Sequence, residues 1–128
     1  MKLLLDTHIF LWFISGDNRL PSSMRDAIED EANDVYLSPV SVWETIVKYQ
    51  PGKLPLPQAP EIYLPLQRKK HFIASLLLDE PSILRLAKIP LLHRDPFDRM
   101  LICQAIEHDL TIVTMDTAIT NYPVKIFN

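Results

Sequence analysis

The stretch Lys2-Leu3-Leu4-Leu5-Asp6 decides the fold class, because it is an apolar run that ends abruptly in a carboxylate. Such a run is typical of a short buried strand, and a helical pattern follows it from Thr7 to about Ser15, where Gly16-Asp17 ends the helix. In an open parallel sheet, the carboxyl ends of the strands lie at one edge, and ligands bind at that edge. The sequence therefore places Asp6 at the binding edge of a sheet.

The rest of the chain continues this alternation of strands and helices. We expect further strands at residues 35–37, 72–78, 110–114 and 124–127. We expect further helices at about 21–31, from residue 39, from about 61 to 71, at 81–88 and 96–108, and a short one after Asp116. Five prolines between residues 51 and 65 predict a surface loop or arm there. The alternation predicts an α/β fold with a parallel sheet covered on both faces.

The composition indicates one compact domain spanning residues 1–128. Hydrophobic residues make up 48% of the 128 residues, and there are only two glycines. No apolar run approaches the roughly 20 residues that cross a membrane, and a charge interrupts the first apolar run too early for a signal peptide. The single cysteine, Cys103, excludes an internal disulfide and a cysteine-based zinc site. These features fit the reducing cytoplasm.

A net charge of −3 argues only weakly against a nucleic-acid partner, because bound cations reverse the sign of an acidic pocket. The position of the basic residues matters more than their number. A basic run lies at Arg68-Lys69-Lys70-His71, although an ordinary solvated face is the better explanation of that run taken alone. The other basic residues of interest are Lys48, Lys53, Arg94 and Arg99.

Acidic residues recur where other strands end or helices begin. Glu44 lies in the segment that follows the second strand, Asp95 and Asp98 open the helix at 96–108, and Asp116 follows the strand at 110–114. Acids from four parts of the chain are therefore expected to meet at one edge of the sheet. Carboxylates gathered in one pocket repel each other unless cations neutralise them, and hard oxygen ligands suit Mg²⁺ or Mn²⁺.

Each acid also has a purely structural explanation. Asp6, Asp95 and Asp116 are good N-cap residues, and Asp98 falls in a first helical turn, where the helix dipole favours a carboxylate. Glu44 matches a capping box with Ser41. However, a proline at position 39 suits the first residue of a helix, which moves the cap to residue 38 and leaves Glu44 with no capping role.

A carboxylate-held metal pocket suits phosphodiester hydrolysis. This reaction needs an activated water, neutralisation of the developing charge and stabilisation of the leaving oxygen, and one or two Mg²⁺ ions supply all three. The hydroxyls of Thr7 and Thr114 are candidates for orienting waters around the ion, because each lies next to one of the acids or the strand end that carries it. The pattern predicts a metal-dependent phosphodiesterase, and most of all a ribonuclease.

At these residues the chain resembles the PIN-domain family, in particular the VapC-type toxins of bacterial and archaeal toxin–antitoxin pairs. Four segments carry the resemblance, in order along nearly the whole chain, and the third is the most specific. The segments are Leu3-Leu4-Leu5-Asp6-Thr7-His8, Ser38-Pro39-Val40-Ser41-Val42-Trp43-Glu44, His93-Arg94-Asp95-Pro96-Phe97-Asp98-Arg99-Met100-Leu101-Ile102-Cys103-Gln104-Ala105 and Thr114-Met115-Asp116.

The resemblance implies an α/β/α sandwich with a parallel sheet of about five strands. It implies that Asp6, Glu44, Asp98 and Asp116 form the metal site, and that Asp95 caps the helix or supports the site from outside. It also implies Mg²⁺- or Mn²⁺-dependent endoribonuclease activity, a cognate VapB-type antitoxin that blocks this activity, and a homodimer. The chain departs from the family pattern at Tyr49-Gln50-Pro51, where the helix after Glu44 usually runs further.

The resulting mechanistic hypothesis assigns a role to each residue. Asp6, Asp98 and Asp116 anchor the ion, and Glu44 holds a water or second ion and acts as the base. Water then cleaves the P–O3′ bond of RNA and leaves a 5′-phosphate. Arg99 either touches the scissile phosphate or forms a salt bridge that positions Asp98, and the salt bridge is the simpler expectation. His8 and His93 are expected to pack at the rim of the pocket.

Three other interpretations of the acidic pattern are a phosphatase, a phospho-receiver domain and a binding module. A dehalogenase-type phosphatase needs a second aspartate two residues after the first, and His8 occupies that position. A phospho-receiver domain needs an aspartate at the end of its third strand with an accompanying Thr/Lys pattern, which is missing after Asp79. A catalytically silent PIN-like domain that serves as a protein-binding module remains the principal alternative.

Overall fold

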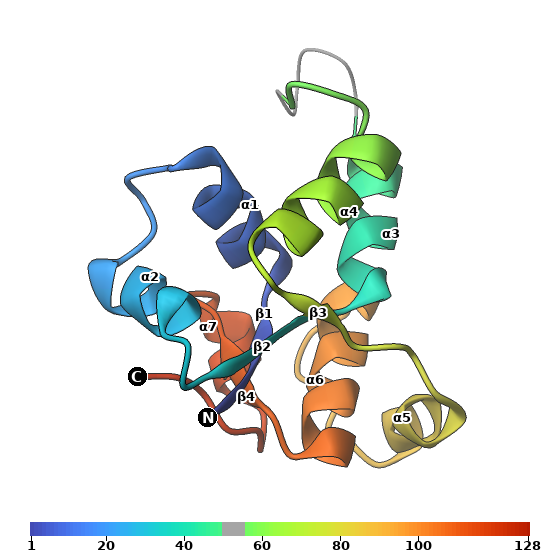
Figure 1. The fold of residues 1–128 in the computed structure, drawn as a ribbon. Helices are drawn as coiled ribbons and strands as arrows, with labels where there is room; N and C mark the ends of the chain where they lie inside the picture. The colour runs from blue at the N-terminus through green and yellow to red at the C-terminus, as the bar shows by residue number, and fades with distance from the viewer. Residues whose placement is uncertain (50–55) are drawn as a thin grey trace.

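A four-stranded parallel sheet forms the centre of the protein (Figure 1). The structure, a computed structural model, describes residues 1–49 and 56–128. The strands stand in the order β3-β2-β1-β4, and every described pairing is parallel. Their bounds are Lys2–Leu5 for β1, Asp34–Leu37 for β2, Ala74–Ser75 for β3 and Thr111–Val113 for β4. The expected α/β fold with a parallel sheet is confirmed.

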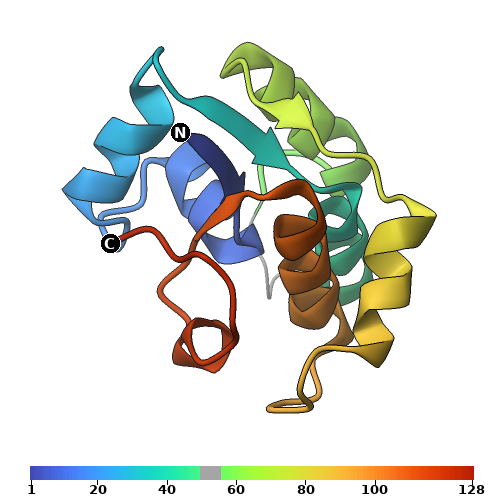
Figure 2. The same ribbon diagram turned by 90° about the horizontal axis from the view of Figure 1, so that it is seen from below.

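Helices cover both faces of this sheet. In both views α1 (Thr7–Ser15) and α2 (Ser22–Glu29) lie on one side of β1, and α6 (Pro96–His108) lies on the other (Figure 2). The remaining helical elements are α3 (Pro39–Lys48), α4 (Pro60–Lys70), α5 (Glu80–Leu84), a 3₁₀ turn at Arg85–Ala87 and α7 (Thr117–Thr120). None of the helices in the described ranges is both long and apolar enough to cross a membrane.

The three leucines of β1 explain why the sheet is covered twice. Successive side chains of a strand point to opposite faces. Leu3 and Leu5 belong to the core under α1, α2 and α4, whereas Leu4 belongs to the core under α6 and α7, and all three are fully buried. Burying one leucine side chain stabilises the folded state by about 1.5–3 kcal/mol. Because its leucines contribute to both cores, β1 is the central element that joins them.

Two expected strands are much shorter than predicted, and the strand expected at 110–114 is shortened to Thr111–Val113. The third strand was expected at 72–78 but contains only Ala74–Ser75. It begins late because Phe72 adopts a left-handed backbone with φ of 56° and is 94% exposed. It ends early because the Gln104 amide binds the carbonyl of Leu76 at 3.1 Å. The last expected strand forms a single parallel bridge between Ile112 and Ile126, so the sheet has four strands with a bridge in the fifth position.

The helices that frame the site begin and end where the sequence predicts. The helix expected at 7–15 is α1, which Gly16 ends in a left-handed conformation with φ of 66°. The helix expected at 96–108 is α6, and Cys103 is fully buried within it. The helix expected at 81–88 is shorter and continues as the 3₁₀ turn.

The proline-rich segment contributes partly to a helix. Pro60 is the first residue of α4, where a proline costs no hydrogen bond, and Pro65 lies inside that helix. The expected arm is therefore shorter than residues 51–65. Residues 50–55, which include the first part of the expected arm, lie outside the described residues, as does most of the departure from the family pattern that begins at Tyr49.

Candidate metal centre

Asp6 is buried at the carboxyl edge of the sheet. Its backbone N–H donates to the carbonyl of Val113 at 3.0 Å, which holds the end of β1 against the end of β4. Its side chain is only 4% exposed and makes no capping bond to α1. Instead, Oδ2 accepts a hydrogen bond of 2.7 Å from the Thr114 hydroxyl. The capping explanation therefore does not account for Asp6.

The surroundings of Asp6 disfavour its negative charge. Burial raises the pKa of Asp6 from 3.8 to about 6, and the nearby charges of Asp98 and Glu44 add to the rise. The hydrogen bond from Thr114 and the charge of His8 oppose the rise only in part. A carboxylate whose pKa is raised toward neutral by burial and by neighbouring carboxylates is typical of a functional site.

Glu44 reaches the same edge from α3. Ser38 caps α3 by accepting a 3.0 Å hydrogen bond from the N–H of Val40, and Pro39 is the first helical residue. Glu44 therefore lies beyond the first turn and has no capping role, as the sequence predicted. The carboxylate is buried, and Oε1 accepts a 2.7 Å hydrogen bond from the Thr7 hydroxyl. The Thr7 hydroxyl also lies 2.8 Å from the Ser41 hydroxyl, so Ser41 helps to fix the threonine that orients Glu44.

Asp95 and Asp98 divide two roles at the start of α6. Oδ1 of Asp95 accepts hydrogen bonds from the N–H groups of Phe97 at 2.9 Å and Asp98 at 3.1 Å, so Asp95 caps the helix. Asp98 projects from the first turn, and its Oδ2 lies 3.0 Å from Nε2 of His93. Burial raises the pKa of Asp98 above its usual range, the bond to His93 opposes this, and the charges of Asp95, Glu44 and Asp116 raise it further.

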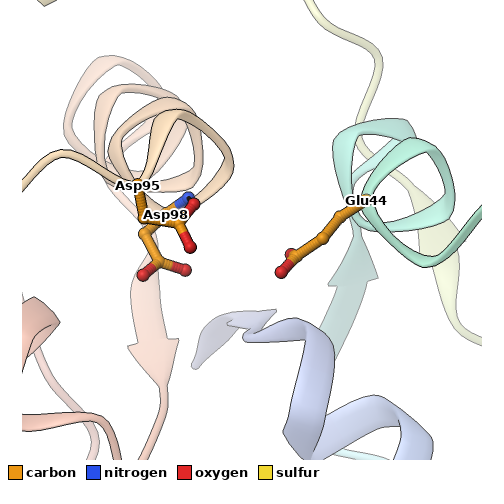
Figure 3. A group of neighbouring side chains, drawn as sticks. All are labelled: Glu44, Asp95 and Asp98. Carbon is orange, nitrogen blue, oxygen red and sulfur yellow. Dashed lines mark hydrogen bonds between the residues drawn. The ribbon is translucent and has the colours of Figure 1, made fainter. Parts of the chain in front are cut away.

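Three of these carboxylates face one another across the edge of the sheet. One side-chain oxygen from each of Glu44, Asp95 and Asp98 lies within 4.8 Å of the others. Figure 3 shows Glu44 extending from α3 toward the two aspartates of α6. Opposite ligands of a Mg²⁺ ion are about 4.2 Å apart, because each Mg–O distance is about 2.1 Å. An all-oxygen donor set of nearly this size suits a hard divalent cation that retains some of its waters.

A lysine partly neutralises this carboxylate cluster. Nζ of Lys48 lies 2.6 Å from Oε2 of Glu44, one turn away on α3, and 3.7 Å from Oδ2 of Asp95. Burial disfavours the ammonium, but the hydrogen bond and charge of Glu44, with the charges of Asp95 and Asp98, raise the pKa of Lys48. The contact of Lys48 with the acidic residues was not predicted from the sequence, although its spacing of four residues from Glu44 signals it.

Asp116 lines the same hollow as Asp6. Its Oδ1 accepts a 2.9 Å hydrogen bond from the N–H of Ala118, so it caps α7, and its side chain is exposed. The hollow has a volume of about 260 Å³, and its other walls include His8 and Trp12. The structure thus brings Glu44, Asp95 and Asp98 into one cluster, and Asp6 shares a hollow with Asp116.

Arg99 does not form the direct salt bridge to Asp98 that the sequence favoured, within the part of the chain that the structure describes. Its Nη1 donates instead to the carbonyl of Pro90 and to the hydroxyl of Tyr122, both at 2.9 Å. Tyr122 in turn contacts His93, which contacts Asp98. Tyr122 was not predicted from the sequence, because nothing local at that position signals a contact with residues more than twenty positions away.

Comparisons with known proteins agree with this architecture. The sequence model of the family described as PIN domain matches residues 3–125. The fold is similar to the structure of VapBC2 from Rickettsia felis bound to a DNA fragment from their promoter, with 17% identity, a TM-score of 0.73, and coverage of 100% of this chain and 98% of that chain.

Two further structures are similar. DNA-bound VapBC from Salmonella typhimurium shares 18% identity with a TM-score of 0.66, covering 100% of this chain and 97% of that chain. FitAcB from Neisseria gonorrhoeae shares 21% identity with a TM-score of 0.62, covering 98% of this chain and 96% of that chain. At these identities the likeness concerns the fold. No curated protein matches the chain in sequence.

Proposed function

We propose, from the premise that this chain belongs to the PIN domain family, that it is a metal-dependent endoribonuclease and the toxin of a type II toxin–antitoxin pair. The observation that carries this proposal is the convergence of Glu44, Asp95 and Asp98 within 4.8 Å, beside the buried Asp6. An acidic site of this kind repels RNA unless a divalent cation is bound, so cation binding and RNA cleavage are proposed together.

Asp6, Asp98, Asp116 and Glu44 are the proposed ligands and catalytic residues, with Asp95 at the edge of the site. When bound, Mg²⁺ or Mn²⁺ supplies charge neutralisation at the phosphate and lowers the pKa of the attacking water. Among the surrounding groups, Thr114 fixes Asp6, and the Thr7 hydroxyl fixes one oxygen of Glu44.

Glu44 is the proposed general base. Its Oε2 accepts a 2.6 Å hydrogen bond from the ammonium of Lys48, which helps to hold the carboxylate at the edge of the cluster. Lys48 is half exposed and therefore accessible to a phosphate group that approaches the cluster. Arg99 was the sequence candidate for phosphate binding, and Lys48 is better placed for that role because it contacts the carboxylates directly.

Exposed apolar residues support the proposal of a protein partner. A large exposed apolar surface marks an interaction site on a protein that is stable in water. Residues of this kind lie on α3 and α4, and they are Trp43, Ile46, Val47, Ile62 and Leu66. We assign this surface to a VapB-type antitoxin or to a second copy of the chain, in keeping with the similarity of the fold to VapBC structures. Such a pair would act in the cytoplasm.

The proposal is tested by incubating the purified chain with a labelled, structurally diverse RNA pool in Mg²⁺, Mn²⁺ or EDTA. We expect cleavage in either metal, none in EDTA, and loss of cleavage in Asp6→Asn and Asp98→Asn. The matched control is Asp26→Asn, which removes an exposed carboxylate of α2 far from the site.

A folded wild type that binds neither metal nor RNA would contradict the enzyme proposal and favour the alternative, a catalytically silent protein-binding module. A parallel incubation with single- and double-stranded DNA distinguishes a ribonuclease from a deoxyribonuclease. Cleavage of DNA alone would overturn the RNA assignment while leaving the metal site intact.

A further inference from the structure

The hydroxyl of Tyr122 is the meeting point of four nitrogen atoms. The backbone N–H groups of Leu92 and His93 each lie 3.2 Å from it, and Nη1 of Arg99 lies 2.9 Å from it. The fourth neighbour is Nδ1 of His93, at 2.8 Å. Tyr122 is 3% exposed, so these contacts are shielded from water.

The proton positions in this group follow from the chemistry of the donors. Two backbone N–H groups and a guanidinium can only donate, so the phenolic oxygen accepts from all three. The phenol has one proton, and among these neighbours only Nδ1 of His93 can accept it. When His93 is a neutral imidazole, its Nδ1 is therefore the acceptor of the phenolic proton.

The tautomer of His93 determines how it meets Asp98. An imidazole that accepts at Nδ1 carries its proton on Nε2, and Nε2 lies 3.0 Å from Oδ2 of Asp98. An ionised carboxylate only accepts hydrogen bonds, so the direction of this bond is consistent at both ends. The bond occupies one oxygen of Asp98 and leaves the other oxygen free for a cation.

We propose that Tyr122 and Arg99 are positioning residues, which act through His93 to hold the Asp98 carboxylate in the orientation that binds a divalent ion. The inference rests on the proposed function, because it takes Asp98 as a metal ligand. Outer partners of this type typically change metal affinity 10- to 100-fold when they are removed. Tyr122 comes from the segment after α7, so the C-terminal part of the chain helps to build the site.

Arg99 completes the arrangement from α6 itself. It is the residue after Asp98, and its guanidinium joins Tyr122 to the carbonyl of Pro90 at the beginning of the loop that carries His93. The loop, the helix and the C-terminal segment are thereby tied together around one phenolic oxygen. A purely packing role for Tyr122 predicts a different outcome, because Tyr122→Phe keeps the ring, which packs edge-on against His93 with centroids 5.4 Å apart.

The test measures Mn²⁺ affinity by calorimetry on the full chain for Tyr122→Phe, His93→Leu, the double variant and His93→Gln. The control Tyr63→Phe removes a hydroxyl from the opposite core. We expect Tyr122→Phe and His93→Leu each to weaken Mn²⁺ binding by about tenfold or more. Because Tyr122 acts through His93, the double variant should be no weaker than His93→Leu alone. His93→Gln, which keeps an N–H donor for Asp98, should recover part of the loss.

Two results would overturn the inference: wild-type Mn²⁺ affinity in Tyr122→Phe, or losses that multiply in the double variant. A long-range ¹H–¹⁵N spectrum of the metal-free protein, recorded at a pH where the His93 imidazole is neutral, gives a readout that depends neither on metal binding nor on activity. It should show the His93 proton on Nε2, and a proton on Nδ1 would equally contradict the arrangement. Asp98→Asn separates the two proposals, because undiminished Mn²⁺ binding in that variant refutes the proposed metal site itself.

Discussion

The Thr114 hydroxyl donates a 2.7 Å hydrogen bond to Oδ2 of Asp6 and so joins the carboxyl ends of β4 and β1 across 108 positions of sequence. This bond orients the buried carboxylate but does not compensate for the loss of water around it, because burial remains the largest influence on its pKa. Asp6 is therefore held in place at a cost to the stability of the protein when its carboxyl group is ionised.

That cost gives a prediction for Asp6→Asn. The pKa of Asp6 rises from 3.8 to about 6 on folding, so the folded state binds a proton more tightly than the unfolded state. This contribution to stability is fully present below pH 3.8 and is lost as the pH rises through about 6, and it amounts to at most about 3 kcal/mol. In EDTA at about pH 8, Asp6→Asn should be more stable than the wild type to urea by about 1–3 kcal/mol.

The stability advantage of Asp6→Asn should shrink as the pH falls from about 6 to about 4, because the wild-type carboxyl becomes protonated in the folded state over this range. Asp26→Asn, at an exposed site, should change the free energy of unfolding by less than about 0.5 kcal/mol. An Asp6→Asn protein less stable than the wild type at alkaline pH would contradict the assignment. In saturating Mn²⁺ the order should reverse, because only the wild type gains stability from the ion.

Thr7→Val should weaken both the fold and the site. The substitution keeps the shape of the side chain but removes the hydroxyl that lies 2.7 Å from Glu44 and 2.8 Å from Ser41. Buried acceptors that lose a partner cost about 1–3 kcal/mol, and we expect a loss of this size in urea unfolding in EDTA. Thr7→Ser keeps the hydroxyl and should retain most of the stability and Mn²⁺ affinity, so an equal loss in both variants would show that the hydroxyl is unimportant.

Lys48→Met should increase the affinity for divalent cations. The ammonium lies 2.6 Å from Glu44 and 3.7 Å from Asp95, so it competes with an ion for the same carboxylates. Because Lys48 is half exposed, solvent screens this interaction, and we expect a gain of about 0.5–1 kcal/mol, or about two- to fivefold in the Mn²⁺ dissociation constant. Lys88→Met, at an exposed position elsewhere, is the control, and an equal gain in both would point to net charge alone.

Replacing Asp95 by asparagine and replacing Asp98 by asparagine should have different effects on stability and activity. Asparagine caps helices as well as aspartate does, so Asp95→Asn should keep the stability of α6, whereas Asp95→Ala should lose about 1 kcal/mol. Asp98→Asn should lower kcat/KM for RNA at least about 100-fold, equivalent to about 2.7 kcal/mol, and Asp95→Asn should lower it less than about tenfold. Equal losses in the two asparagine variants would make Asp95 a full partner in the site.

The sequence predicted the elements that depend on neighbouring residues. The strand at residues 2–5, the cap at Ser38 and the helix at 96–108 follow from short patterns of apolar, polar and proline residues, and each is found where expected. The placement of Asp6, Glu44 and Asp98 at one edge followed from the alternation of strands and helices alone. Ligand types and a preference for Mg²⁺ or Mn²⁺ follow from residue chemistry and need no coordinates.

Local patterns failed where a distant group competes for the backbone. The strand expected at 72–78 is cut short because Gln104 of α6 binds the carbonyl of Leu76, and no feature of residues 72–78 announces that contact. The expected salt bridge between Arg99 and Asp98 is replaced by a path through Tyr122 and His93 for the same reason.

By itself, then, the sequence determined which acids reach the binding edge, because strand ends and helix starts are set by contiguous residues. Only the tertiary structure decided which of them meet. Asp95 rather than Asp6 joins Glu44 and Asp98 within 4.8 Å, and Asp116 faces the hollow beside Asp6. The physical reason is that distances between side chains on different elements depend on how helices pack across the sheet, and that packing is fixed by the two buried cores rather than by any local pattern.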